Sequence, residues 1–175
     1  YRKEEATKEV LTEDGWFSTG DVGIIDEEGY IKITDRIKDL IITAGGKNIA
    51  PQQIELLVGE DIYIEHVAAI GDGRKYISAL IVPAFEVLEE YCRNNGITFS
   101  SPEELIAKPE IIAFYRERID KATAGLGRVE QIKKFTLLPK AFSQEDGEIT
   151  PTMKVRRKVV NQKYNDVIEA MYTGE

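Results

Sequence analysis

The stretch "GWFSTGD", residues 15–21, ends in a carboxylate that could recognise a sugar diol. Asp21 follows small, flexible residues, and its two oxygens match two neighbouring ribose hydroxyls, from which they can accept hydrogen bonds. Aspartate is also a common turn residue, so Asp21 could instead begin a strand and cap a turn. This motif alone leaves both interpretations open.

A second stretch, "TDRIKDLIITAGGKN" at residues 34–48, holds an arginine and a pair of glycines. Arg36 could fork onto ribose or phosphate oxygens, because its guanidinium presents several donors in one plane. Gly45 and Gly46 would let the backbone approach a thin ligand closely, because they carry no side chain. The alternative is a salt-bridged surface followed by an ordinary glycine turn.

The third stretch is "EITPTMKVRRKVV", residues 148–160, in which a lysine precedes an amphipathic helical pattern. Lys154 is a compact charge on a flexible stem, suited to neutralising charge that moves between a carboxylate and a phosphate. Mounted on a loop, it could be delivered and withdrawn. Residues 151–163 hold five basic residues and no acid, and such a run is most often only a solvated face.

Other chemistries find less support in the sequence. His66 is the only histidine and lies in a β-like run, so we expect a packing or surface residue. Cys92 is the only cysteine, which excludes an internal disulfide, and no cluster suggests a metal site. The chain has no GxSxG nucleophile motif and no GxxxxGK[ST] phosphate loop.

Composition limits the class of protein further. The 175 residues include 31 acids and 23 bases, a net charge of −8 that disfavours nucleic-acid binding. No apolar stretch is long enough to cross a bilayer, although peripheral membrane contact is not excluded, and the first 15 residues are too polar for a signal peptide. We therefore expect a cytoplasmic protein. The chain starts at Tyr1 without an initiator methionine, so we also expect it to belong to a longer protein.

The patterns between these motifs predict an α+β fold, with a small mixed or antiparallel three-stranded sheet flanked by helices and with β-hairpins at the N-terminal end. "SPEEL" predicts a capping box of Ser101 and Glu104. The predicted elements, in order, are a hairpin over 21–36, an extended run and glycine turn over 39–48, a helix from Pro51, strands within 65–83, a helix ending at Gly96, a helix over 109–124, a strand over 132–139 and one terminal helix from about residue 155.

Together the motifs resemble the adenylate-forming superfamily, which includes acyl-CoA synthetases, peptide-synthetase adenylation domains and luciferases. "DGWFSTGD", "DRIKDLIITAGGKNIAP" and "PTMKVRR" occur in the order and approximate spacing of the late motifs of that superfamily. "GDGRKYISALIVP" and "ITPTMKVRR" look most like AMP-forming long-chain fatty acyl-CoA synthetases. The similarity runs from about residue 11 to residue 160 and is looser between 85 and 128.

The resemblance implies a division of the chain. Residues 1–37 would be the tail of a large N-terminal domain, and residues 38–175 the mobile lid domain that closes over it, with the hinge at Lys38. The large domain would carry the phosphate loop, the adenine pocket and the acyl tunnel, none of which occurs in this sequence. The chain alone is therefore expected to be inactive.

The resemblance also implies a two-step reaction. A fatty acid would react with Mg²⁺–ATP to give acyl-AMP, and coenzyme A would then take the acyl group and release AMP. Asp21 and Arg36 would hold the ribose, and Lys154 would act in the first step. In the second step the "AGGKN" loop with Gly45 would reach the active site and bind the cofactor, and Gly46 would line the pantetheine channel. Mg²⁺ would be bound with ATP, mainly by the other domain. The chain has Ile42 and Thr43 in the strand where many relatives have a second lysine, and its glycine loop is one residue longer.

Two alternatives remain from the sequence. The chain could belong to an adenylate-forming enzyme that loads a carrier protein instead of coenzyme A. It could also be a non-catalytic interaction module that uses its acidic N-terminal face or its basic terminal helix to bind a partner. A pure binding module, however, has no need for Asp21, Arg36 and Lys154 together.

Overall fold

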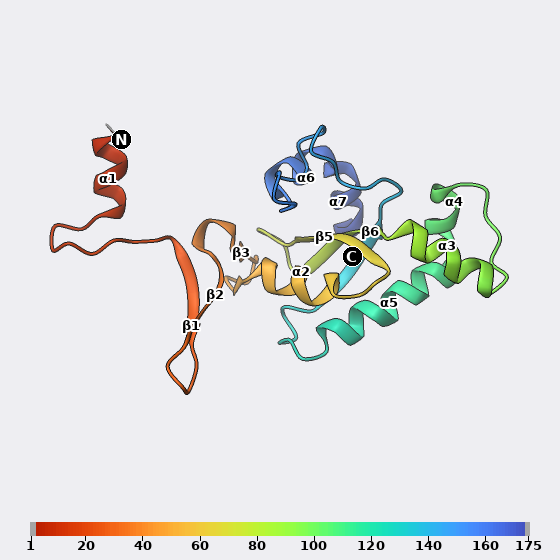
Figure 1. The fold of residues 1–175 in the computed structure, drawn as a ribbon, viewed down its shortest axis with the longest axis horizontal. Coiled ribbons are helices and arrows are strands. Elements are labelled where there is room, and N and C mark those ends of the chain that lie inside the picture. The colour runs from red at the N-terminus through yellow and green to blue at the C-terminus, as the bar shows by residue number, and fades with distance from the viewer. Residues whose placement is uncertain (1–2, 174–175) are drawn as a thin grey trace.

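A mixed three-stranded sheet forms the centre of the computed structural model, which describes residues 3–173 (Figure 1). Strand β6 (Ile77–Pro83) lies between β5 (Ile64–Ile70) and β7 (Ile132–Leu137). It pairs antiparallel with β5 and parallel with β7. The predicted α+β class and the mixed three-stranded sheet are therefore confirmed.

Side chains of the sheet alternate between two apolar clusters, because successive residues of a strand point to opposite faces. In β6, Ala79 and Ile81 join one cluster, while Leu80 and Val82 join the other. All seven residues of β6 are buried. A strand covered on both faces reads as a continuous apolar run, and "ISALIVP" is such a run.

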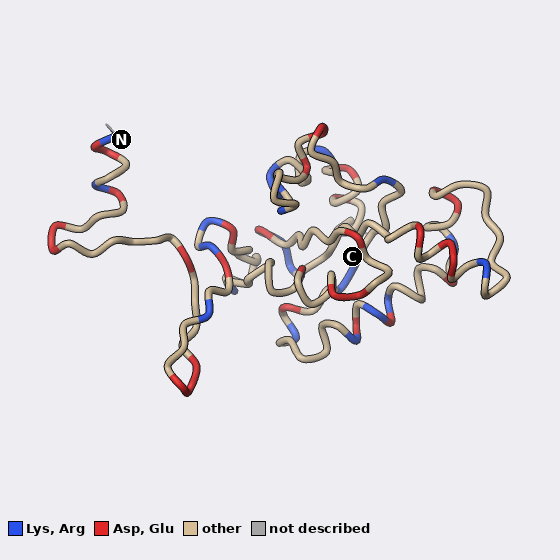
Figure 2. Tube along the Cα trace, viewed as in Figure 1, with Lys and Arg blue, Asp and Glu red and all other residues tan. Residues whose placement is uncertain are grey.

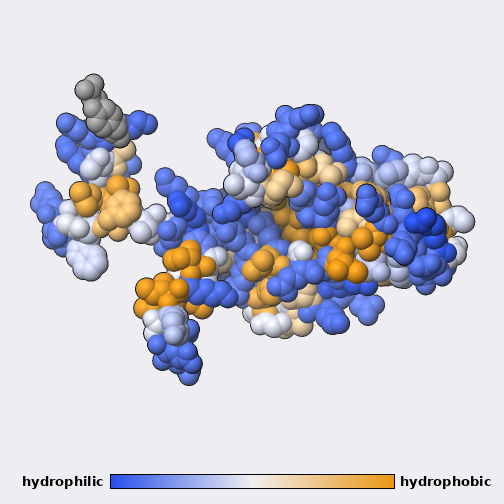
Figure 3. All heavy atoms as spheres, viewed as in Figure 1, coloured by the Kyte–Doolittle hydropathy of each residue, from blue (hydrophilic) through white to orange (hydrophobic). Residues whose placement is uncertain are grey.

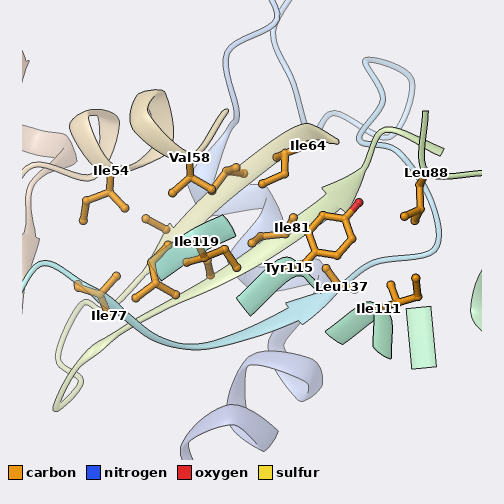
Figure 4. Close-up of a cluster of buried hydrophobic side chains, with 14 of the residues drawn as sticks. Ile54, Val58, Ile64, Ile77, Ile81, Leu88, Ile111, Tyr115, Ile119 and Leu137 are labelled. Carbon is orange, nitrogen blue, oxygen red and sulfur yellow. The ribbon is translucent and has the colours of Figure 1, made fainter. Parts of the chain in front are cut away.

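Helices α2 (Pro51–Gly59), α3 (Phe85–Asn94), α4 (Pro102–Ala107) and α5 (Pro109–Thr123) belong to the first cluster. Helix α2 begins with proline at its first turn, as predicted, and buries Ile54 and Val58, four residues apart on one face. Figure 4 shows the side chains of this cluster, including Tyr115, whose hydroxyl donates to the carbonyl of Tyr63 at 2.7 Å. Burial raises the pKa of Tyr115.

The predicted helix signals at residues 96–104 are confirmed, with one difference. Gly96 has φ 70° just after α3, a backbone conformation that suits glycine. Ser101 Oγ accepts from the Glu104 N–H at 3.3 Å, which is the first half of the expected capping box. The Glu104 carboxylate, however, accepts from the N–H of Ser100 at 2.8 Å, one residue before the cap.

The second cluster is covered by the C-terminal part of the chain, which forms two helices where one was predicted. Helix α6 (Arg157–Lys163) and helix α7 (Asn165–Tyr172) are separated at Tyr164, which has φ −105° and ψ 22°. The Tyr164 hydroxyl donates to Glu148 at 2.7 Å, and its ring lies 6.0 Å from that of Phe142. At this break, the Tyr164 side chain thus contacts the segment that contains Phe142 and Glu148.

The N-terminal part forms an arm beside this body (Figure 1). The predicted hairpin is present as β1 (Asp21–Ile25) and β2 (Ile31–Arg36), which pair antiparallel. Its acidic tip is visible in Figure 2. At this tip Asp26 Oδ1 accepts from the N–H of Tyr30 at 2.8 Å. Helix α1 (Glu4–Val10) was not predicted, and it buries none of its residues.

Large apolar side chains on the arm are exposed to solvent. Part of this apolar surface is visible in orange on the arm in Figure 3. Their exposed fractions run from 56% to 74% for Trp16, Phe17, Ile24, Ile25, Ile31 and Ile33. Contiguous exposed apolar surface usually marks an interaction site, so the hairpin has the character of a surface that another part of a protein covers.

Two glycines provide a test of how closely the body is packed. A Cβ added at Gly71 would lie 2.5 Å from Ile77 Cδ1 and 3.1 Å from Ile41 Cγ2, whereas one at Gly59 would meet no atom within 4 Å. Because Ile77 is itself buried, Gly71→Ala should destabilise the protein by about 1–3 kcal/mol. Gly59→Ala should be neutral or stabilise it by about 0.4–1 kcal/mol, since it restricts the unfolded chain. Urea unfolding measures both, and equal midpoints would contradict the packing described.

Candidate functional site

Asp21 and Arg36 lie opposite each other at the open end of the hairpin. Arg36 Nε lies 2.8 Å from Asp21 Oδ1, and the arginine side chain is largely exposed. Asp21 is the first residue of β1, and its N–H donates to Thr19 Oγ1 at 3.1 Å. The structure therefore brings these two predicted site residues together as an accessible pair of opposite charge.

Asp35, which sequence analysis did not single out, connects the hairpin to the body. Its side chain is 2% exposed. Oδ1 accepts from the N–H of Arg36 at 2.7 Å, and Oδ2 accepts from the N–H of Gln52 at 3.1 Å. Gln52 lies in the first turn of α2, where N–H groups lack helical partners and a carboxylate is favourable.

The short connection between the hairpin and the body contains Lys38. This residue lies in the 3₁₀ turn Ile37–Asp39, which buries none of its side chains. The Asp35–Gln52 hydrogen bond joins residues on either side of that turn. A rotation at Lys38 would therefore have to break this hydrogen bond.

The glycine turn lies between β3 (Ile41–Ile42) and β4 (Asn48–Ile49). The N–H of Gly46 donates to the carbonyl of Thr43 at 2.8 Å, and Gly46 has φ 72°, which favours glycine. A Cβ at Gly45 would approach only Thr43 Oγ1, at 4.0 Å. The predicted open backbone is thus present on one side of the turn.

The turn between β5 and β6 holds this glycine turn in place. The N–H of Ala44 donates to the carbonyl of Arg74 at 2.8 Å, and the N–H of Gly73 donates to the carbonyl of Ile42 at 2.8 Å. Asp72 Oδ1 accepts from the N–H of Ile42 at 3.1 Å. The glycine turn is therefore attached to the central sheet.

A cleft of about 270 Å³ opens beside Gly45, and we call it the basic cleft. No acidic residue is among its described lining. Sequence analysis missed its cations because they come from four separate segments. The lining residues are Thr43, Gly45, Lys47, Lys75, Tyr76, Arg128, Val129 and Lys133.

Lys154 stands on a tight turn, as the loop motif predicted. The N–H of Thr150 donates to the carbonyl of Lys154 at 2.8 Å, and the N–H of Lys154 donates to Thr150 Oγ1 at 3.0 Å. Met153 has φ 61°, the one positive φ of a non-glycine residue among those described. The Lys154 side chain is exposed on this turn.

Lys154 lines a second cleft of about 760 Å³, which we call the lysine cleft. Its walls come from α2, β5 and residues 153–159, together with Asp39 and Thr150. It shares no lining residue with the basic cleft, and neither lining includes Asp21 or Arg36. Lys154 and Gly45 thus belong to separate recesses of one body.

The basic run around Lys154 is only partly a solvated face. Arg157 donates to both carboxylate oxygens of Glu55 at 2.7 Å, and Glu55 also accepts from the N–H of Ala69 at 2.8 Å. Burial raises the pKa of Glu55, against the opposing effect of Arg157. This ion pair attaches the lysine-bearing segment to α2 and β5.

His66 stacks on Phe142 with ring centroids 5.6 Å apart, as a packing residue does.

Residues 38–175 match the family described as the AMP-binding enzyme C-terminal domain. This chain belongs to that family. The chain is 42% identical to the long-chain-fatty-acid–CoA ligase FadD15 of Mycobacterium tuberculosis, over 100% of this chain and 29% of that protein. It is 32% identical to the long-chain-fatty-acid–CoA ligase heimdall of Drosophila melanogaster, over 96% of this chain and 30% of that protein. The chain therefore spans less than a third of the curated relatives it matches.

The fold of this AMP-binding enzyme C-terminal domain also occurs in solved structures. The adenylation domain of a carboxylate reductase from Mycobacterium chelonae superposes with a TM-score of 0.79 at 25% identity, over 99% of this chain and 26% of that one. The resemblance to the adenylate-forming superfamily is thus confirmed.

Within residues 3–173 no set of three or more His, Cys, Asp or Glu side chains is placed to hold a metal ion. Among the same residues, no helix has the length and apolar character needed to span a membrane.

The segment before Lys154 provides a prediction about pH. Asp146 accepts from Lys140 Nζ at 3.0 Å and from Lys163 Nζ at 2.8 Å, and the two lysines lower its pKa to about 2. A lowered carboxyl pKa stabilises the fold above the unfolded value of about 3.9, and this contribution disappears as the pH falls towards 2. Asp146→Asn should therefore lower the melting temperature near neutral pH, and the difference should close as the solution is acidified. Thermal unfolding at several pH values measures it, and a difference that is independent of pH would contradict the assignment.

Proposed function

We propose that this domain is the mobile lid of a long-chain fatty acid–CoA ligase, which activates a fatty acid with ATP to acyl-AMP and then transfers the acyl group to coenzyme A. The observation that carries the proposal is the presence of Lys154 and Gly45 in two separate recesses of one body. A lid of this kind could offer one recess to each half-reaction. The names of the relatives support the choice of substrate class.

In the first half-reaction, the fatty acid carboxylate attacks the α-phosphate of ATP, and pyrophosphate leaves. Lys154 would contact the carboxylate and the phosphate as negative charge moves between them, and a preorganised cation stabilises that transition state. Asp21 would accept hydrogen bonds from the ribose hydroxyls, with Arg36 beside it. Mg²⁺ would enter bound to the phosphates of ATP.

In the second half-reaction, the thiol of coenzyme A attacks the acyl carbon of acyl-AMP, and AMP leaves. The glycine turn would line the channel for the pantetheine arm, since Gly45 and Gly46 leave space beside the backbone. The four cations of the basic cleft would neutralise the phosphates of coenzyme A. Coenzyme A carries three phosphate groups, whereas the arm of a carrier protein carries one, so a cleft lined by several cations suits coenzyme A better as the acyl acceptor.

Residues 1–37 would belong to the large domain, with residues 38–175 as the lid and Lys38 as the hinge. The family match begins at residue 38, which supports this division. The exposed isoleucines of the hairpin would then be covered by the rest of the large domain. We place the enzyme in the cytoplasm, where fatty acid, ATP and coenzyme A are all accessible to it.

The two half-reactions test the assignment of Lys154 and the glycine turn. In the enzyme that joins this chain to its large domain, Lys154→Ala should slow acyl-AMP formation by about 10²-fold to 10³-fold and spare thioester formation from supplied acyl-AMP. Gly45→Leu should do the reverse, because it fills the channel. Gly45 is a better position than Gly46, whose φ of 72° would add backbone strain to the effect of size.

Pyrophosphate release and thioester yield are the two measurements. Each variant is the control for the other, and the chain without its large domain is the blank. Equal slowing of both half-reactions by Lys154→Ala would refute the assignment. So would unchanged thioester formation in Gly45→Leu.

The basic cleft yields a separate prediction about coenzyme A. Lys75→Glu should raise the KM for coenzyme A about tenfold, because a hydrogen bond to a charged group contributes about 1.5–3 kcal/mol. The KM for pantetheine, which lacks the nucleotide phosphates, should not change. Arg93→Glu is the matched control, since Arg93 is an exposed residue of α3 that lines neither cleft. A rise in KM for both acceptors, or for neither, would show that the basic cleft does not bind the phosphates of coenzyme A.

A further inference from the structure

Glu148 is a fully buried carboxylate at the base of the turn that carries Lys154. Its exposed fraction is 0%. Oε1 accepts from the Tyr164 hydroxyl at 2.7 Å and lies 3.0 Å from Lys163 Nζ, and Oε2 accepts from the N–H of Ser143 at 2.9 Å. Three donors from two segments of the chain therefore hold both carboxylate oxygens.

The Glu148 side chain remains charged in this environment. Burial alone would raise the pKa of its carboxyl, but the hydrogen bonds from Tyr164 and Ser143 and the Lys163 ammonium bring the pKa below its ordinary value. A buried charge is tolerated only when it is paired and hydrogen-bonded, and all its partners are in place here. Because both carboxylate oxygens have partners, the position of the side chain is fixed by more than one contact.

Backbone hydrogen bonds connect Glu148 to the turn that carries Lys154. Its carbonyl accepts from the N–H of Arg156 at 2.7 Å, and the next residue, Ile149, bridges antiparallel to Val155. One step further, Thr150 and Lys154 exchange the two hydrogen bonds that close the turn. A short ladder thus connects the buried carboxylate to the exposed lysine.

We propose that Glu148 is a positioning residue that sets the place of Lys154 in the acyl-AMP-forming step, by fixing the base of its turn to the junction of α6 and α7. The proposal rests on the proposed function, in which Lys154 acts in that step. Glu148 itself, buried beneath the turn, contacts no substrate. It affects the reaction only through the position of Lys154.

A merely structural role would have a different consequence. The same carboxylate contributes to packing of the C-terminal layer, where Tyr164 and Phe142 join the second cluster. Loss of that packing would disturb the whole body, including the glycine turn, and would slow both half-reactions. Loss of positioning would slow only the step that uses Lys154.

The test uses Glu148→Gln in the enzyme that contains the large domain. A misplacement of about 1 Å in a reacting group can cost about 10²-fold, so acyl-AMP formation should fall by about 10-fold to 10²-fold. Thioester formation from supplied acyl-AMP should be unchanged. Glu104→Gln is the matched control, since Glu104 also accepts from a backbone N–H, at 2.8 Å, but lies at α4, away from the lysine turn.

A double variant shows whether Glu148 affects acyl-AMP formation through Lys154 or independently of it. If Glu148 acts through Lys154, then Glu148→Gln should cause little further loss of acyl-AMP formation in the Lys154→Ala background. If Glu148→Gln does not fold, Tyr164→Phe decides the matter, because it removes one donor to Glu148 and keeps the ring. It should give a smaller loss confined to the same step.

Each result has a defined meaning. A selective loss that vanishes in the Lys154→Ala background supports the proposal. Equal losses in both half-reactions, or losses that multiply in the double variant, would overturn it and leave the proposed function standing. If Lys154→Ala itself leaves acyl-AMP formation intact, both the proposed function and the positioning role fail.

Discussion

The burial of β6 on both faces is the constraint on which the rest of the body depends. Its seven residues have no solvent-facing side, so helices must cover the sheet above and below. Helices α2 and α5 supply one cover, and α6 and α7 supply the other. The polar side chain of this strand, Ser78, is satisfied by the hydroxyl of Tyr172 at 2.8 Å, which also fastens α7 to the sheet.

Both recesses of the candidate site are attached to this sheet by polar contacts. The glycine turn is bound to the turn between β5 and β6, and Arg74 of that turn also pairs with Glu169 of α7. The lysine-bearing segment is bound through Arg157 to Glu55 and through Glu148 to Tyr164. Because Lys154 and the glycine turn are both attached to the same sheet and helices, a rotation of that body would move them together. This is the property that a lid serving two steps requires.

Local patterns predicted those elements whose cause is local. The hairpin, the proline at the start of α2 and the glycine after α3 follow from turn chemistry and backbone preference, which act over a few residues. Helix α1 was missed because it buries no side chain, so it leaves no apolar periodicity to detect. The break at Tyr164 was missed because its hydroxyl binds Glu148, sixteen residues earlier in the chain. The apolar pattern continues across that break.

The sequence by itself determined the family and the candidate residues Asp21, Arg36, Gly45 and Lys154. Motifs of distinctive residue types at a fixed spacing can be recognised without knowledge of the fold. Their environment was decided by the tertiary structure. Asp35 binds Gln52, Glu148 binds Tyr164, and the cations of the basic cleft come together from separate segments of the chain. No local pattern distinguishes a buried carboxylate from an exposed one, since burial and pairing depend on which segments the fold brings together.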